Sequence, residues 1–160
     1  MKAVYLAIPF LALTAGAAVA NDTIEKQVVV TATVPTDKFY VEPVGGNWMN
    51  EPQDMAWNSF QGTLEPIRKQ LQAKSTLGPI SAHLLYPAQI SSGVDAIPLN
   101  VKVGTTLLST TSTEVIGKDQ AGAGVVVDFE VAAAPLAGGG DYKPGNYQGL
   151  VSMMFETPAP

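Results

Sequence analysis

Enzymes commonly use histidine as a general base, and this chain contains a single histidine, His83. Its neighbours form an apolar run, Ala-His-Leu-Leu at 82–85, which is typical of a β-strand. General-base catalysis also needs a nucleophile and an orienting group, and the sequence pairs neither with His83 at a recognisable spacing. We therefore interpret His83 as a strand residue that faces solvent or a satisfied partner. We predict no catalytic residue and no enzymatic activity.

Metal and phosphate sites lack the residues they require. Zinc and copper sites are built largely from cysteine and histidine, and the chain has no cysteine. The closest carboxylate pairs, Glu51 with Asp54 and Asp128 with Glu130, are too dispersed for a calcium loop. A Gly-Ala-Gly run at 122–124 precedes a predicted strand, whereas a phosphate-binding loop follows a strand and opens a helix. We expect neither a metal nor a cofactor.

The first twenty residues are typical of a secretory signal peptide. Lys2 is followed by an apolar stretch at 3–15 and by Ala-Val-Ala at 18–20, which predicts cleavage before Asn21. A membrane anchor is the alternative, but the stretch is shorter than the ~20 residues of a spanning helix, so we expect no membrane insertion. Without Lys2 the chain has 8 basic and 14 acidic residues. The basic residues are scattered, so we expect no nucleic-acid partner.

The rest of the chain has the composition of a β-protein. Charged residues make up only 14% of the sequence, and glycine (15) and proline (12) are plentiful, which favours short strands separated by turns. A helical alternative exists at 64–74, where Leu64, Ile67 and Leu71 have helical spacing. We predict an all-β fold, a β-sandwich. Its strand candidates are 39–44, 64–72, 79–86, 97–103, 125–133 and 146–156, with a Ser/Thr-rich run at 107–115.

A separate strand precedes Pro35. Residues 24–34 have a period-2 pattern rich in β-branched residues and span about 36 Å when extended. The proline that follows them cannot donate to a β-ladder and ends the strand. The pattern by itself leaves two interpretations open: an edge strand of the chain's own sandwich, or a strand that pairs with another molecule. One face carries Ile24, Lys26, Val28, Val30, Ala32 and Val34; the other carries Glu25, Gln27, Val29, Thr31 and Thr33.

Two tryptophans, Trp48 and Trp57, bracket an acidic, proline-containing segment without clear periodicity. We predict that residues 47–63 loop over the surface. The tryptophans then either form a contact loop for a carbohydrate or a protein, or pack over one end of the sandwich.

Both ends of the chain after Asn21 resemble the α-class fimbrial major subunits (class 5, alternate chaperone/usher pathway), a family that includes the colonisation-factor fimbriae and the cable pili. The resemblance rests on the strand at 24–34, on Leu-Ser-Thr-Thr at 108–111 with Glu114, on Ala-Ala-Pro at 133–135, and on Gly-Asn-Tyr-Gln-Gly-Leu-Val-Ser at 145–152. The chain has no cysteine, which is similar to members of this family and unlike the type 1 pilins, which carry a disulfide. The segment at about 45–63 departs from the family pattern.

The resemblance implies an incomplete immunoglobulin-like β-sandwich that is completed by a donor strand from a neighbouring subunit. Residues 1–20 are then the signal peptide, 21–35 the donor-strand extension and 36–160 the sandwich. Lys26 is the one charged residue on the face of the leader that is expected to insert, and we expect it to lie over a shallow or open pocket. A slip of one residue in register would exchange the two faces of the leader. The implied donor-strand residues are Ile24, Val28, Val30, Ala32 and Val34, and the implied acceptor groove is lined by Tyr147, Gly149, Val151, Met153 and Phe155.

By this resemblance the protein is the major structural subunit of a fimbria. The resemblance further implies export of the protein through the periplasm to the cell surface, head-to-tail polymerisation with its own copies and support of adhesion. Its implied partners are a periplasmic fimbrial chaperone, an outer-membrane usher and a tip adhesin. Two alternatives stay open: a minor or tip subunit that binds host glycan through the Trp48–Trp57 loop, and a monomeric periplasmic β-sandwich binding module whose leader folds back on its own body.

Overall fold

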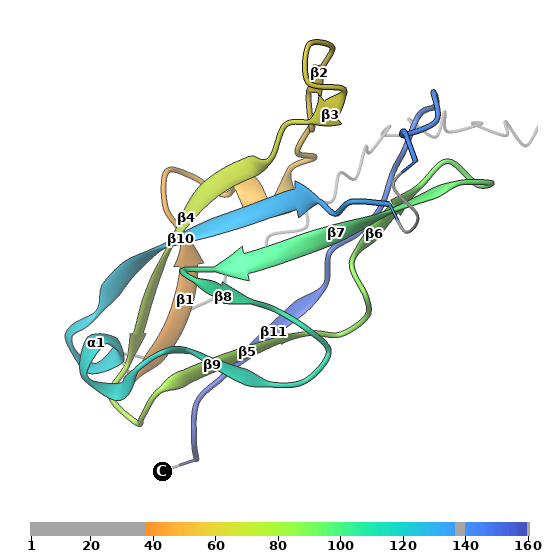
Figure 1. Cartoon of the computed structure of the whole chain (residues 1–160). Helices are drawn as coiled ribbons and strands as arrows, with labels where there is room; N and C mark the ends of the chain where they lie inside the picture. The colour runs from red at the N-terminus through yellow and green to blue at the C-terminus, as the bar shows by residue number, and fades with distance from the viewer. Residues whose placement is uncertain (1–37, 137–139, 160) are drawn as a thin grey trace, which may run out of the picture. The chain divides into compact units, whose positions relative to one another are not determined.

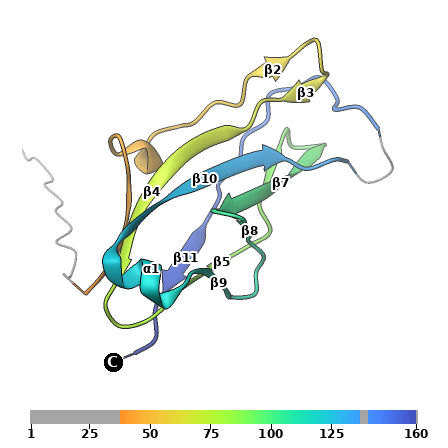
Figure 2. The same cartoon turned by 60° about the vertical axis from the view of Figure 1, so that its left-hand side comes forward.

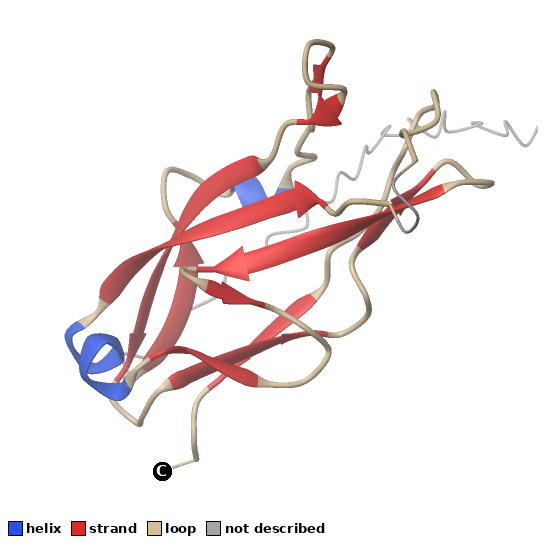
Figure 3. Ribbon diagram, viewed as in Figure 1, coloured by secondary structure: helices blue, strands red, loops and turns tan. Residues whose placement is uncertain are grey.

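The computed structural model describes residues 38–136 and 140–159. The predicted signal peptide and the leader at 24–34 lie outside these residues. Nearly all regular structure in the described part is β, with one α-helix, α1 (Lys118–Ala123), and one 3-10 turn, η1 (Trp48–Asn50) (Figure 3). The prediction of an all-β protein is confirmed.

The strands form two antiparallel sheets and a small hairpin (Figure 1). The larger sheet has the order β1-β4-β10-β7-β6, and β8 adds to β7. The smaller sheet has the order β11-β5-β9. The large sheet comprises β1 (Phe39–Pro43), β4 (Ile67–Ser75), β6 (Gln89–Ser91), β7 (Ala96–Val103), β8 (Thr106–Leu107) and β10 (Val125–Ala133). The small sheet comprises β5 (Ile80–Leu84), β9 (Thr113–Ile116) and β11 (Met153–Glu156), and the hairpin comprises β2 (Trp57–Asn58) and β3 (Thr63–Leu64).

The core lies between the two sheets and follows the period-2 alternation of their strands. In β4, Leu71 and Ala73 are fully buried, while the intervening Gln70 and Gln72 are exposed. In β5, Ile80 and Ala82 are fully buried in the same way. Each sheet thus has one apolar and one polar face, and burying the two apolar faces together holds the sandwich closed.

Two ends of this sandwich can be distinguished in both views (Figures 1 and 2). The β2–β3 hairpin projects at one end, which we call the hairpin pole. Helix α1, the first residue of the described chain and the C-terminal residues lie at the other, which we call the helix pole. Strand β11 runs from the hairpin pole toward the helix pole, and β1, which pairs antiparallel with β4, begins at the helix pole with Phe39 opposite Ser75.

Most of the strand predictions are confirmed, with instructive exceptions. The prediction at 125–133 coincides with β10, and the prediction at 39–44 with β1. The helical alternative at 64–74 is wrong, because this segment forms β4 in the middle of three hydrogen-bonded strands. The predicted strand at 146–156 is shorter than expected, since only Met153–Glu156 forms β11. The surface loop predicted at 47–63 contains η1 and most of the β2–β3 hairpin.

Replacing Leu71 by alanine tests the core. Leu71 is fully buried between the sheets, so its loss removes apolar contacts and leaves a cavity. We expect Leu71→Ala to lower the free energy of unfolding by about 2–5 kcal/mol in guanidinium titrations followed by circular dichroism. Val126→Ala is the control, because Val126 is 51% exposed and should change stability by at most about 0.5 kcal/mol. Equal effects of the two substitutions would contradict this assignment of the core.

Candidate functional site

The apolar residues of the small sheet are less covered at one edge than behind it. In β5, which has a partner on each side, Ile80, Ala82 and Leu84 are 0%, 0% and 5% exposed. Their neighbours across the ladder, Met153 and Phe155 of β11, point to the same core but are only half-buried. Burial therefore falls toward the outer edge of β11.

The first strand of the large sheet has the same property. Phe39 and Val41 of β1 are half-buried, although the β4 residues opposite them on this face are fully buried. Phe39, Val41 and Phe155 all pack against one set of buried residues. The outer strands of both sheets thus border the same part of the core, which consists of Ala73, Ile80, Ile116 and Ala121.

We call the five half-buried apolar residues of these two strands and of the segment leading into β11 the edge row: Phe39, Val41, Val151, Met153 and Phe155. Within the described chain, β11 is hydrogen bonded to β5 and no strand pairs with its other edge. An edge of this kind offers backbone donors and acceptors beside an apolar surface, which is the surface that an added β-strand can cover.

Sequence reasoning named three of the edge-row residues and missed the two on β1. Val151, Met153 and Phe155 were among the predicted groove residues, and the structure places all three against the core. Phe39 and Val41 were not named. Their apolar spacing at i and i+2 was available as a signal, but only the fold brings β1 beside the same core residues as β11.

The other two predicted groove residues, Tyr147 and Gly149, require a correction, because they lie beside β6 and not on β11. Gln148 forms an isolated bridge with Ser91, with N···O distances of 2.8 and 3.0 Å. The chain reaches β5 only after this bridge, where the Leu85 amide donates to Ser152 at 2.9 Å. The prediction counted back every second residue from Phe155 to Tyr147 as if one strand ran through the whole segment. It fails because the segment pairs with β6 at Gln148 and with β5 only from Ser152 onward.

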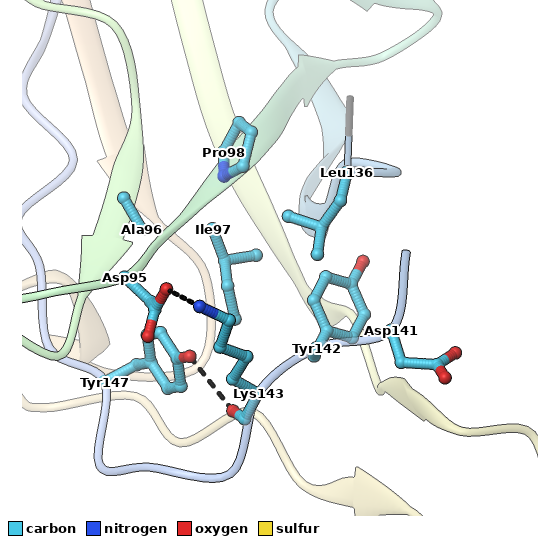
Figure 4. A pocket seen from close by; sticks show the side chains of 9 residues that line it. All are labelled: Asp95, Ala96, Ile97, Pro98, Leu136, Asp141, Tyr142, Lys143 and Tyr147. Carbon is cyan, nitrogen blue, oxygen red and sulfur yellow. Dashed lines mark hydrogen bonds and ion pairs between the residues drawn. The ribbon is translucent and has the colours of Figure 1, made fainter. Parts of the chain in front are cut away.

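Tyr147 instead lines a shallow cavity of about 340 Å³ near the start of β7 (Figure 4). Its hydroxyl donates to the Lys143 carbonyl at 3.0 Å, and the Tyr142 hydroxyl donates to the Ala134 carbonyl at 3.0 Å. Lys143 Nζ lies 2.7 Å from an Asp95 carboxylate oxygen. The hydrogen bond and the charge of Asp95 raise the pKa of Lys143. Lys143 thus holds the segment at 141–147 to the residue before β7, Tyr142 holds it to the residue after β10, and the Tyr147 hydroxyl bonds within the segment. Since these polar groups are used within the fold, we assign the cavity a structural role.

Gly149 is required by a close approach of two backbones. A Cβ atom at this position would lie 2.2 Å from the Gln89 carbonyl oxygen and 3.0 Å from the Ile90 Cα atom. Both are backbone atoms, which cannot move aside as a flexible side chain can. The glycine thus lets the last segment of the chain lie directly on β6.

The two tryptophans have different environments. Trp48 is 8% exposed and stacks on Phe129 with ring centroids 5.4 Å apart. Of the two alternatives for the tryptophans, packing on the sandwich therefore holds for Trp48, and a surface contact at Trp48 is wrong. Trp57 is 51% exposed and meets Tyr142 edge-on, with centroids 6.4 Å apart. Trp57 alone of the pair can contact an outside partner.

His83 faces away from the core, beside the last strand. Its Nδ1 atom lies 3.8 Å from a carboxylate oxygen of Glu156, and that carboxylate accepts a hydrogen bond from the Ser112 hydroxyl. Since Ser112 bonds to the carboxylate and not to the imidazole, these three residues lack the nucleophile–base hydrogen bond of a hydrolase. Among the described residues no three acidic or imidazole side chains gather as a metal site, and no helix has the length and apolarity to cross a membrane.

Comparison with known proteins agrees with this architecture. Residues 24–156 match the family described as the CS1 type fimbrial major subunit. The chain belongs to this family. The protein is therefore a structural subunit of a cell-surface fimbria, and fimbrial subunits of this kind polymerise with their own copies.

A solved structure shares the fold of this fimbrial subunit. The CooA pilin subunit from enterotoxigenic Escherichia coli superposes with a TM-score of 0.61 at 18% sequence identity, over 74% of this chain and 86% of that one. At this identity the similarity establishes the fold, an immunoglobulin-like sandwich. No curated protein sequence matches the subunit.

Gly149→Ala tests the close approach of the last segment to β6. We expect it to destabilise the fimbrial subunit by roughly 1–3 kcal/mol, because the added methyl group meets backbone atoms. Gly122→Ala is the matched control, since a Cβ atom there meets nothing within 4 Å and alanine favours helix α1. The measurement is the midpoint of guanidinium unfolding of each purified variant. An unchanged midpoint in Gly149→Ala would show that the contact with β6 is absent.

Proposed function

We propose that this protein is the major shaft subunit of a fimbria assembled by a chaperone and an usher, and that it polymerises by donor-strand exchange. Residues 24–34 of one copy add as a strand to the edge of β11 in the next copy. The resulting head-to-tail interface does not close on itself and so generates an open fibre, which supports adhesion to surfaces.

The observation that carries this proposal is the fall in burial toward β1 and β11. A strand laid beside β11 pairs with its free edge and covers the edge row at the same time. Covering apolar area stabilises the assembly by about 25 cal/mol per Å² removed from water. The leader supplies suitable side chains, because Ile24, Val28, Val30, Ala32 and Val34 share one face of its alternation.

The direction of the added strand follows from immunoglobulin-like topology, in which neighbouring strands of each sheet are antiparallel. The strand that pairs with β11 therefore runs antiparallel to β11. The leader then runs from the helix pole of the accepting copy toward its hairpin pole, parallel to β1. Its last residue, Val34, lies nearest the hairpin pole of the accepting copy.

Before assembly, an uncovered edge row would favour aggregation of the subunit, because an exposed strand edge beside apolar side chains can pair with other chains. A periplasmic chaperone strand that occupies the same edge removes this hazard, and an outer-membrane usher exchanges it for the leader of the next subunit. A tip adhesin at the end of the fibre completes the set of proposed partners. Export through the periplasm is part of this proposal.

Val30→Asp tests the donating side. A carboxylate on the inserted face would be buried without a partner, which costs several kcal/mol, so we expect no fibres in electron micrographs of expressing cells. Val29→Asp is the matched control, since Val29 lies on the opposite face of the same strand, and we expect it to retain fibres. Fibres of normal length from Val30→Asp would contradict the proposed donor face.

Met153→Asp tests the accepting side. Met153 packs against the core, whereas Met154, its neighbour in β11, points outward and is 47% exposed. We expect Met153→Asp to abolish fibres and Met154→Asp to retain them.

Expressing Met153→Asp together with Val30→Asp separates a blocked interface from a misfolded subunit. The first variant can donate but not accept, and the second can accept but not donate. We therefore expect heterodimers without longer polymers, measured by mass after purification. Fibres from Met153→Asp alone, or no heterodimer from the pair, would contradict the assignment.

A further inference from the structure

We infer that successive subunits make a second contact, in which the β2–β3 hairpin of the accepting copy docks on the helix pole of the donating copy. This inference rests on the proposed donor-strand exchange. It concerns the segment of the chain where the sequence departs from the family pattern, and it starts from the tip of the hairpin.

The hairpin tip is held in one conformation by its own hydrogen bonds. The Asn58 side-chain oxygen accepts from the backbone N–H groups of Phe60 and Gln61 at 3.1 and 3.0 Å, and the Asn58 carbonyl accepts from Gly62 at 2.8 Å. Gly62 has φ of +64°, which suits glycine at this corner. At the base, the Glu65 amide donates to Ala56 at 2.8 Å. A turn ordered in this way loses little conformational entropy when it binds.

This ordered turn presents an aromatic ring to solvent. Phe60 is 98% exposed, the highest value among the large apolar residues of the described chain. Below it, Trp57 is 51% exposed and is held edge-on by Tyr142. Aromatic side chains at the tip of a rigid element are typical anchors of protein interfaces.

The two poles carry complementary charges. Asp54 and Glu65 flank the hairpin, and Asp141 precedes the tyrosine that packs on Trp57; none of the three forms an ion pair with another described residue. At the helix pole, Lys38 precedes β1 and Lys118 begins α1.

A third lysine, Lys74, lies at the end of β4, with its side chain beside Gly124, which caps α1. Within the described chain these lysines also lack ion-pair partners. The carboxylates near them are Asp119 in α1 and Glu114, whose side chain lies beside Gly117 at the start of the helix. The three lysines exceed these two carboxylates, so the helix pole of a second copy complements the acidic hairpin pole in charge.

Chain connectivity brings these two poles together. The leader joins the described body at Lys38, at the helix pole, and three residues separate Val34 from Lys38. The four Cα–Cα steps from Val34 to Lys38 span at most about 14 Å. Since Val34 lies toward the hairpin pole of the accepting copy, the helix pole of the donating copy must lie close to that hairpin.

Cysteine cross-linking tests the contact, and the natural chain contains no cysteine to interfere. The pair Gln61→Cys with Lys118→Cys places one thiol at the hairpin tip and one on α1. The control pair, Gln61→Cys with Thr105→Cys, moves the second thiol to the exposed turn between β7 and β8. Fibres are assembled under reducing conditions and then treated with a short bifunctional maleimide. We expect covalent ladders from the first pair and monomers from the control.

The possible outcomes separate this inference from the proposed function. Intact fibres in which the two pairs cross-link equally would overturn the hairpin contact and leave donor-strand exchange standing. Failure of both the cysteine variants and the natural chain to form fibres would contradict the proposed function itself, and with it the inference.

Phe60→Ser provides a test without introduced thiols. We expect fibres that still form but dissociate at a lower guanidinium concentration than natural ones, whereas Leu107→Ser, at a 53% exposed position on β8, should leave dissociation unchanged. Unchanged dissociation of Phe60→Ser fibres would overturn the inference. Loss of attachment to host cells with unchanged fibre stability would also overturn it, because the hairpin would then contact a different molecule.

Discussion

A β-strand edge beside a partly covered apolar core constrains this molecule more than any other feature. Backbone N–H and C=O groups on the outer side of β11 require partners, and the half-buried Met153 and Phe155 next to them require cover. An extended strand meets both requirements at once. Within the described residues, β11 therefore offers an edge beside apolar side chains that an added strand could cover.

The rest of the body holds this edge in place. Strand β5 is buried between β11 and β9, and its inward residues Ile80 and Ala82 are fully covered. Gly149 lets the segment before β11 approach β6, and the ion pair of Lys143 with Asp95 attaches the preceding segment to β7. The edge row thus rests on strands and segments that are held by buried contacts, hydrogen bonds and an ion pair.

A fibre whose subunits are joined through one strand each would be linked by a chain of short connectors. The three residues between Val34 and Lys38 would let successive bodies touch, and an aromatic hairpin at one pole would then meet lysines at the other. A contact of this kind would restrict the angle between subunits and so influence how the fibre winds and resists force.

The sequence by itself determined the β-class, most strand positions and the family, because period-2 alternation and turn residues are local properties. The inward parity of Val151, Met153 and Phe155 also follows from alternation. Only the tertiary structure decided what depends on distant parts of the chain: 64–74 is a strand because it lies between β1 and β10, Trp48 is buried because it stacks on Phe129, and Gly149 meets β6 and not the edge row. Local patterns carry no information about which surfaces meet across the sandwich, and that is where these predictions failed.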